Sequence, residues 1–149
     1  MAVLKSACEH SAQALNEVER SLSDGPKAQL ESFFTQHLQA LLANPQSTQL
    51  IQRELLESGS ERGRQLANEV FSEHFSKLVA LVREGQSQDM LRKDFDAALL
   101  AFLLVGANIF FFETRTVLKH LPEVDFAEPS DHYSSAVFDL LLRGIEKTS

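Results

Sequence analysis

Three polar side chains stand among apolar neighbours in this sequence and are the first candidates for chemistry. His37 and His74 each lie among apolar and aromatic residues, and Asn108 is the single polar side chain between Ala97 and Phe112. Imidazole and amide groups in such surroundings suit hydrogen bonding to a molecule bound in an apolar cavity. Each also has a plainer interpretation. The histidines could be half-buried helix residues, and Asn108 could fix the register of a dimer interface.

The sequence gives little support for catalysis or metal binding. No Asp or Glu is followed three residues later by a His, the spacing that a helical di-iron site needs, and His-Glu-x-x-His is absent. Cys8, the single cysteine, precedes Glu9, an acidic neighbour that does not activate a thiol. The segment GSERG, from Gly59 to Gly63, is typical of a helix start rather than a phosphate-binding loop. We therefore expect no enzyme activity, no cofactor and no metal.

Length, charge and cysteine content favour one domain over residues 1–149. A chain of 149 residues can bury a sufficient core without disulfides, and one cysteine allows no internal disulfide. The net charge of −7, with no basic stripe, argues against nucleic-acid binding by this chain itself. The first residues lack the apolar segment of a signal peptide, so we expect a cytoplasmic protein.

Apolar residues recur with a helical period throughout, whereas strand-like alternation is absent, so we expect an all-α fold. The predicted helices cover residues 4–22, 26–42, 45–57, 60–84, 94–121 and 130–146. Their ends are assigned from the residue types that favour caps and first turns, namely Pro26, Asn44, Pro45, Ser60, Gly85 and Asp94.

The predicted fifth helix, residues 94–121, is apolar on every side, so it must be enclosed by protein or lie in lipid. Its apolar run from Ala97 to Phe112 is shorter than the roughly 20 residues of a membrane span, and we expect no membrane insertion. The last helix also has two adjacent apolar faces. We therefore expect a homodimer in which the last two helices form a four-helix bundle. The alternative is a monomer with the fifth helix at the centre of its core.

The residues expected at this dimer interface lie on the predicted helices over residues 94–121 and 130–146. They are Phe110, Phe111, Val117, Tyr133, Val137, Phe138, Leu141, Leu142 and Ile145.

Three segments, in this order, resemble the C-terminal, ligand-sensing domain of TetR-family transcriptional regulators. MAVLKSACEHSAQAL resembles the first helix after the DNA-binding domain. NPQSTQLIQRELLESG, residues 44–59, resembles a helix entry after Asn-Pro with an Arg-Glu-Leu segment. LVREGQSQDMLRKDFDAALLAFLLVGANIFF, residues 81–111, resembles the glycine-containing connector and the long helix that follows it. Asp89 and Ala97 depart from the pattern, where many members have glycine and proline.

The resemblance covers essentially the whole chain and implies a six-helix regulatory domain of the TetR C-terminal type. The family's N-terminal helix-turn-helix, which enters the major groove, is not in this sequence. The chain begins where that module would end, so we expect a fragment that keeps the sensing and dimerising parts. Operator DNA would be bound only through the missing N-terminal domain.

The resemblance also implies a pocket between the second, third, fourth and fifth helices for a small, apolar or aromatic effector. A bound effector would shift the dimer between two arrangements. The alternative function is a helical dimerisation or scaffold domain without a ligand, in which the phenylalanines are plain core. The residues expected to bind the effector are Phe33, His37, Phe71, His74, Phe75, Phe102, Asn108 and Phe112.

Overall fold

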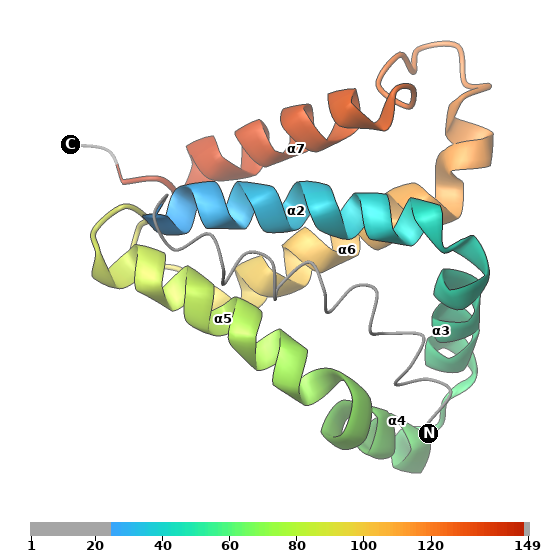
Figure 1. Cartoon of the computed structure of the whole chain (residues 1–149), viewed down its shortest axis with the longest axis horizontal. Helices are drawn as coiled ribbons and strands as arrows, with labels where there is room; N and C mark the ends of the chain where they lie inside the picture. The colour runs from blue at the N-terminus through green and yellow to red at the C-terminus, as the bar shows by residue number, and fades with distance from the viewer. Residues whose placement is uncertain (1–24, 148–149) are drawn as a thin grey trace.

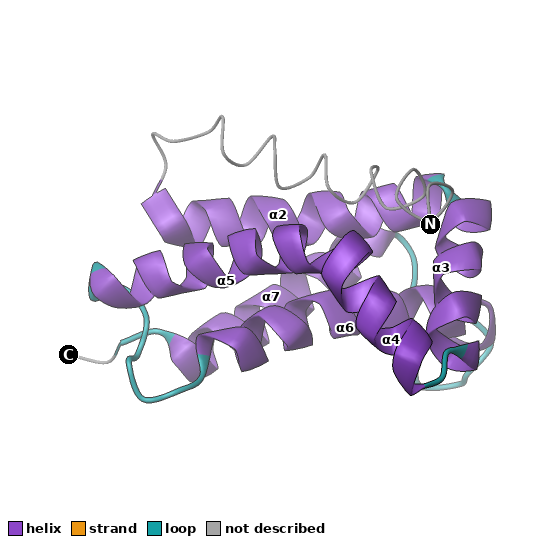
Figure 2. Cartoon of the chain, turned by 90° about the horizontal axis from the view of Figure 1, so that it is seen from below, coloured by secondary structure: helices purple, strands orange, loops and turns teal. Residues whose placement is uncertain are grey.

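A computed structural model describes residues 25–147, and the predicted helix over residues 4–22 lies outside this range. The described residues form helices joined by short loops (Figure 2). Within them no strand is found, apart from one isolated bridge between Leu91 and Glu146, so the predicted all-α class is confirmed. The elements are α2 (Gly25–Ala43), α3 (Pro45–Glu57), α4 (Ser60–Leu66), the π-helical turn η2 (Ala67–Phe71), α5 (Ser72–Ser87), α6 (Ala97–Leu118) and α7 (Ser130–Ile145).

Helix α2 is the centre of the arrangement and packs on α5, α6 and α7. Figure 1 shows α2 between α7 and α5, with α6 crossing behind it. Helix α3 turns across the end of α2, and both views place α3 and α4 together, at the end of the molecule away from residue 147. A cavity described below lies at this end of the molecule, between α2, α3, α6 and the η2–α5 segment.

The main core is formed by the faces of α2, α5, α6 and α7 that point at one another. Phe34 on α2 is fully buried and its ring lies 6.0 Å from that of Phe138 on α7. A second, smaller cluster joins α3 to the α4–η2 segment around Leu66 and Val70. Because burial of apolar surface is the main favourable contribution to folding, the α2-centred core holds the fold together.

The start of α6 is capped differently from the prediction. Asp96, not Asp94, caps α6, and its carboxylate accepts a hydrogen bond from Ala98 N at 2.9 Å. Asp94 is instead held by the Arg92 guanidinium through two hydrogen bonds of 2.9 and 3.0 Å, so it is not available as a cap.

The caps of α3 and α4 also differ. Asn44 precedes α3 as predicted, with Pro45 in the first turn, but its amide donates back to Ala40 O at 2.9 Å rather than capping α3. Gly59, not Ser60, occupies the N-cap position of α4.

Gly85 does not end its helix. Helix α5 continues to Ser87, and the left-handed residue after it is Asp89, with a φ of 64°. Asp tolerates this conformation better than most residues. Gly85 is buried inside the helix, where a Cβ would lie 2.7 Å from Leu91 Cδ1. The glycine thus provides space for Leu91, which returns against α5 after the turn.

The predicted helix over residues 60–84 is also not regular. It is interrupted by η2, whose wider turn accommodates one extra residue between α4 and α5. π-helical turns of this kind are frequent at functional sites. Here the turn carries Phe71.

The link between α5 and α6 is fastened to the residues that follow α7. Arg92 N donates to Ile145 O at 2.7 Å, and Lys147 N donates to Met90 O at 3.3 Å. The Arg92 guanidinium also donates to Gly144 O at 2.8 Å. These bonds join segments more than fifty residues apart in sequence and fix the end of α7 against the link.

Candidate functional site

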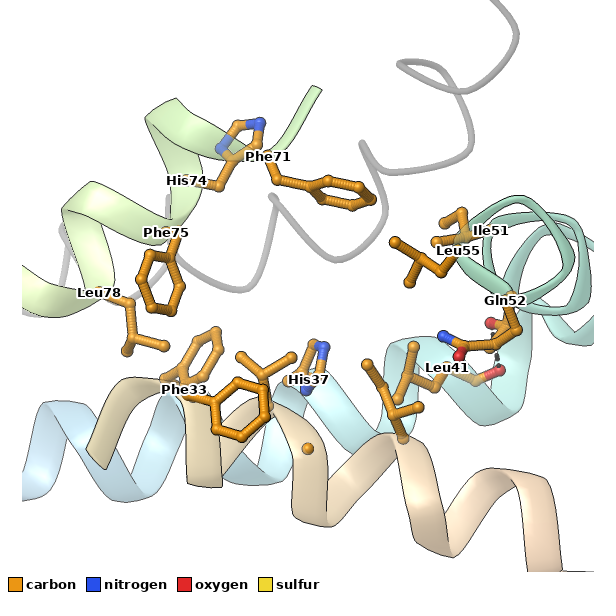
Figure 3. Close-up of a pocket in the computed structure, with 15 residues that line it drawn as sticks. Phe33, His37, Leu41, Ile51, Gln52, Leu55, Phe71, His74, Phe75 and Leu78 are labelled. Atoms are coloured by element: carbon orange, nitrogen blue, oxygen red, sulfur yellow. Dashed lines mark hydrogen bonds between the residues drawn. The ribbon is translucent and has the colours of Figure 1, made fainter. Parts of the chain in front are cut away.

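A cavity of about 320 Å³ lies between α2, α3, α6 and the η2–α5 segment. Figure 3 shows side chains of three of these walls around one space, with the ring of His74 turned away from its centre. None of the lining residues is Asp, Glu, Lys or Arg. The lining residues are Phe33, His37, Leu41, Thr48, Ile51, Gln52, Leu55, Phe71, His74, Phe75, Leu78, Phe102, Val105, Gly106 and Ile109.

Each wall is one face of a helix. Phe33, His37 and Leu41 follow one another at four-residue intervals on α2, so their side chains share a face. Similar spacings of three and four residues place the lining residues of α3, α5 and α6 on faces that converge. The walls are mostly apolar and aromatic, which suits a small apolar molecule with few polar groups.

His37 is a buried polar group of the lining, with 5% of its surface exposed. Its ring stacks on Phe33, with centroids 5.3 Å apart and planes 14° apart. Burial lowers the pKa of His37 from 6.5 to about 4, so the imidazole is neutral at neutral pH.

Asn108 lies behind the cavity wall, between α6 and α2. It is fully buried, and its Nδ2 lies 3.1 Å from Phe34 O and 2.9 Å from His37 Nδ1. Asn108 is not among the residues that line the cavity. It faces neither of the two surroundings considered from the sequence, an effector or a partner subunit, because α2 covers it.

Thr48 and Gln52 are also polar residues of the lining, and they differ in whether their side chains can hydrogen-bond to a bound molecule. The Thr48 hydroxyl is 3.1 Å from Leu41 O and 3.0 Å from Asn44 O, so its hydrogen is used by the backbone. Gln52, on α3, points its amide towards the same space as His37 (Figure 3).

The structure brings six of the eight predicted effector-binding residues into one lining, and two lie elsewhere. Phe112 is buried below the Arg115 guanidinium, whose carbon lies 4.0 Å from the ring centroid. Neither Phe112 nor Asn108 is among the residues that line the cavity. The residues that do line the cavity are Phe33, His37, Phe71, His74, Phe75 and Phe102.

The α3 wall was expected from the family resemblance, but no residue was assigned to it. Thr48, Ile51, Gln52 and Leu55 supply it. Their spacing of three and four residues was readable in the sequence. The mixture of polar and apolar types along this face hid the signal.

Four of the residues expected at a dimer interface are buried in the core of their own chain: Phe111, Tyr133, Phe138 and Leu142. Phe138 packs against Phe34, and Tyr133 stacks on Phe111. These two pairs fix α7 against α2 and α6, which is why these side chains do not face outward. Val137, Leu141 and Ile145 are partly buried beside the same core.

An apolar stripe remains exposed along α6. Leu99, Leu103, Phe110 and Val117 recur at intervals of four and seven residues, and they are 53%, 44%, 67% and 60% exposed. Phe102, which also lines the cavity, borders this stripe and is 62% exposed. On α7, Leu140 is 72% exposed. Of the residues expected at the interface, Phe110 and Val117 lie on this α6 stripe.

Helix α6 is the one helix among residues 25–147 that is long and apolar enough to cross a membrane by length and composition. Only 39% of its most apolar 18-residue segment is buried within the chain. Also within these residues, no group of three or more His, Cys, Asp and Glu side chains could hold a metal ion.

Two of the solved structures that share this arrangement of helices are described as transcriptional regulators. A TetR/AcrR-family transcriptional regulator from Thermobifida fusca YX-ER1 is 20% identical, with a TM-score of 0.66 over 96% of this chain and 70% of its own. A TetR-family transcriptional regulator from Chloroflexus aurantiacus J-10-FL is 17% identical, with a TM-score of 0.66 over 99% of this chain and 71% of its own.

A protein of unknown function from Rhodococcus sp. RHA1 also has this fold, at 15% identity and a TM-score of 0.75, over 98% of this chain and 71% of its own. No curated protein sequence matches the chain. The family model for the tetracyclin repressor-like C-terminal domain matches residues 26–140. That range includes all the helices that form the cavity and most of α7, and the resemblance drawn from the sequence is confirmed. The chain belongs to the family of tetracyclin repressor-like C-terminal domains.

Proposed function

We propose that this domain binds a small, largely apolar effector in the cavity between α2, α3, α5 and α6. The observation that carries the proposal is the cavity itself, about 320 Å³ of space with no Asp, Glu, Lys or Arg in its walls. Small-molecule sites in proteins are concave spaces of about this size with mostly apolar walls. The converging aromatic side chains of Phe33, Phe71 and Phe75 favour an aromatic or otherwise flat molecule.

The domain also forms a homodimer through the exposed faces of α6 and α7. The stripe of Leu99, Leu103, Phe110 and Val117 is a row of exposed apolar side chains on one helix, and exposed apolar patches mark interaction surfaces. A twofold axis along this stripe would pair α6 and α7 with their copies in a four-helix bundle. Phe102 touches both regions, so occupancy of the cavity and the geometry of the dimer can influence each other.

In a regulator that carries a helix-turn-helix, the effector would change the distance between two DNA-reading heads. A molecule that fits one arrangement of the helices better than another shifts the dimer towards that arrangement. Binding to operator DNA would be controlled in this way in the cytoplasm. The domain itself contributes sensing and dimerisation, not catalysis.

The cavity is tested by thermal unfolding with a library of neutral aromatic and aliphatic compounds. A compound that binds the native state at one hundred times its Kd adds about 2.7 kcal/mol of stability and raises Tm by several degrees. In Leu55→Trp the indole enters the cavity, and the rise in Tm should disappear. Leu56→Trp is the matched control, because Leu56 is 83% exposed and outside the lining. A library without a single hit, or hits that persist in Leu55→Trp, would favour a ligand-free scaffold.

A further inference from the structure

Asn108, which lies behind the cavity wall, controls which ring nitrogen of His37 carries the proton. Asn108 Nδ2 lies 3.1 Å from Phe34 O, a backbone carbonyl that can only accept. The amide must therefore turn its NH2 group towards this carbonyl, because the opposite orientation would place two oxygens against each other. The same nitrogen lies 2.9 Å from His37 Nδ1.

The orientation of Asn108 decides the tautomer of His37. With one N–H used by Phe34 O, the second N–H of the amide points at His37 Nδ1, which must then be the acceptor. A neutral imidazole that accepts at Nδ1 carries its proton on Nε2. Burial supports this neutral form, since it lowers the pKa of His37 to about 4.

The protonated nitrogen faces the cavity. His37 is one of the lining residues, and Figure 3 shows one of its ring nitrogens directed into the space between the walls. Its Nδ1 is engaged with Asn108 behind the wall, so the nitrogen that faces the space is Nε2. Among residues 25–147 this nitrogen makes no hydrogen bond, since the one side-chain bond of His37 is that of Nδ1.

We propose that the Phe34 carbonyl and Asn108 lock His37 as an Nε2–H donor, so that the cavity selects neutral molecules with a hydrogen-bond acceptor. This inference rests on the proposed effector function and names the chemistry of the effector. A ketone, ether or aromatic nitrogen satisfies the donor. A carboxylate or an ammonium group would be desolvated among walls without Asp, Glu, Lys or Arg, and so is disfavoured.

The tautomer can be measured without any ligand. Long-range ¹H–¹⁵N NMR of the imidazole rings should show one histidine in the neutral Nε2–H form from pH 7 down to pH 5.5, and its signals should vanish in His37→Phe. Asn108→Leu removes the amide that fixes the tautomer, and signals from both tautomers are then expected. An Nδ1–H form in the wild type, or protonation of His37 at pH 6, would overturn the proposal.

The selectivity is measured by calorimetry with benzophenone and diphenylmethane, which have nearly the same shape. A purely apolar cavity prefers diphenylmethane, because it loses no hydration of a carbonyl on entry. We expect the wild type to prefer benzophenone and His37→Phe to prefer diphenylmethane. The ratio of the two affinities should change by about fivefold to tenfold, the value of one neutral hydrogen bond.

His37→Gln is the second variant, because its amide can present an N–H at the same wall. It should keep part of the preference for benzophenone. In the wild type, benzophenone should also shift the Nε2 resonance of His37, whereas diphenylmethane should leave it unchanged. This measurement tests the donor even if the His37 variants do not fold. Equal affinities for both compounds would overturn the proposal that His37 donates to the ligand, whereas the proposal that the cavity binds an effector would still hold. If neither compound binds, the donor proposal fails, and the wider library decides separately whether the cavity binds an effector.

Discussion

The ring of Tyr133 lies against that of Phe111, with centroids 4.0 Å apart and planes 18° apart. The Tyr133 hydroxyl donates to Ala107 O, about one turn earlier on α6. One side chain of α7 thus makes both an aromatic and a polar contact with α6. Tyr133 is the single tyrosine of the chain, which also has no tryptophan, so its spectrum reports this contact without interference.

Burial raises the pKa of Tyr133 to about 12. Because the folded-state pKa lies above the unfolded value near 10, this group contributes its full stability below pH 10 and loses it as pH rises towards 12. The absorbance of tyrosinate at 295 nm should therefore appear late, together with the loss of helical circular dichroism. Tyr133→Phe should cost about 1 kcal/mol at pH 7 for the lost hydrogen bond. If the Tyr133 hydroxyl titrated near pH 10 while the helices stayed intact, the buried position of Tyr133 would be contradicted.

His37 should make the domain less stable in mild acid. Its pKa is about 4 when folded and 6.5 otherwise, so the unfolded chain binds more protons between these values and stability falls as pH falls through this window. From pH 7 to pH 5 the loss should be about 2 kcal/mol, measured by urea unfolding. His37→Phe should lose this part of the pH dependence. His120→Gln, a change at an exposed histidine beyond α6, is the control and should keep it.

The α6 stripe should hold the dimer. Phe110→Glu places a charge at a side chain that is 67% exposed in the single chain, so the fold should be unaffected while the dimer dissociates. Light scattering coupled to size exclusion should show a twofold fall in mass at micromolar concentration. Leu56→Glu is the matched control, since Leu56 is 83% exposed on α3, away from the stripe. A wild type that is monomeric at this concentration would remove the basis for the proposed bundle.

Gly85 should tolerate no side chain. A Cβ there would lie 2.7 Å from Leu91 Cδ1, and Leu91 is 1% exposed and has little room to move. Gly85→Ala should lose about 1 to 2 kcal/mol, because the crowding outweighs the roughly 1 kcal/mol that alanine adds in a helix. Gly63→Ala, with nothing within 4 Å of its Cβ, should gain up to about 1 kcal/mol. Urea unfolding of both variants measures the change in the free energy of unfolding. Equal changes for Gly85→Ala and Gly63→Ala would exclude a packing role for Gly85.

The sequence predicted the helices better than their ends. Helix α3 and the start of α7 are as predicted, because Asn44–Pro45 and the prolines before Ser130 are strong local signals. The start of α6 was wrong because Asp94 and Asp96 are equally good caps by type, and only the position of Arg92 decides between them. The end of α5 was wrong because Gly85 serves Leu91, a partner six residues away that local rules do not include.

The candidate site was predictable as a set of aromatic residues on helices, but not as a geometry. Helical period placed Phe33 and His37 on one face of α2 correctly. It could not show that Asn108 faces α2, because a helix that is apolar on every side gives no signal for the direction of any one side chain. For the same reason Phe110 and Phe111, adjacent in sequence, could not be assigned to the surface and the core.

The bonds between the α5–α6 link and the residues after α7 bear on how the domain can be labelled. Glu146 and Lys147 run beside Leu91 and Met90, so a group attached at Lys147 lies next to an internal link. A bulky fusion at this position would pull on the junction of α5 and α6. A small spin label would instead sense any displacement of that junction, far along the chain from its own attachment point. This position therefore suits a probe of effector-driven motion and is a poor choice for an affinity tag.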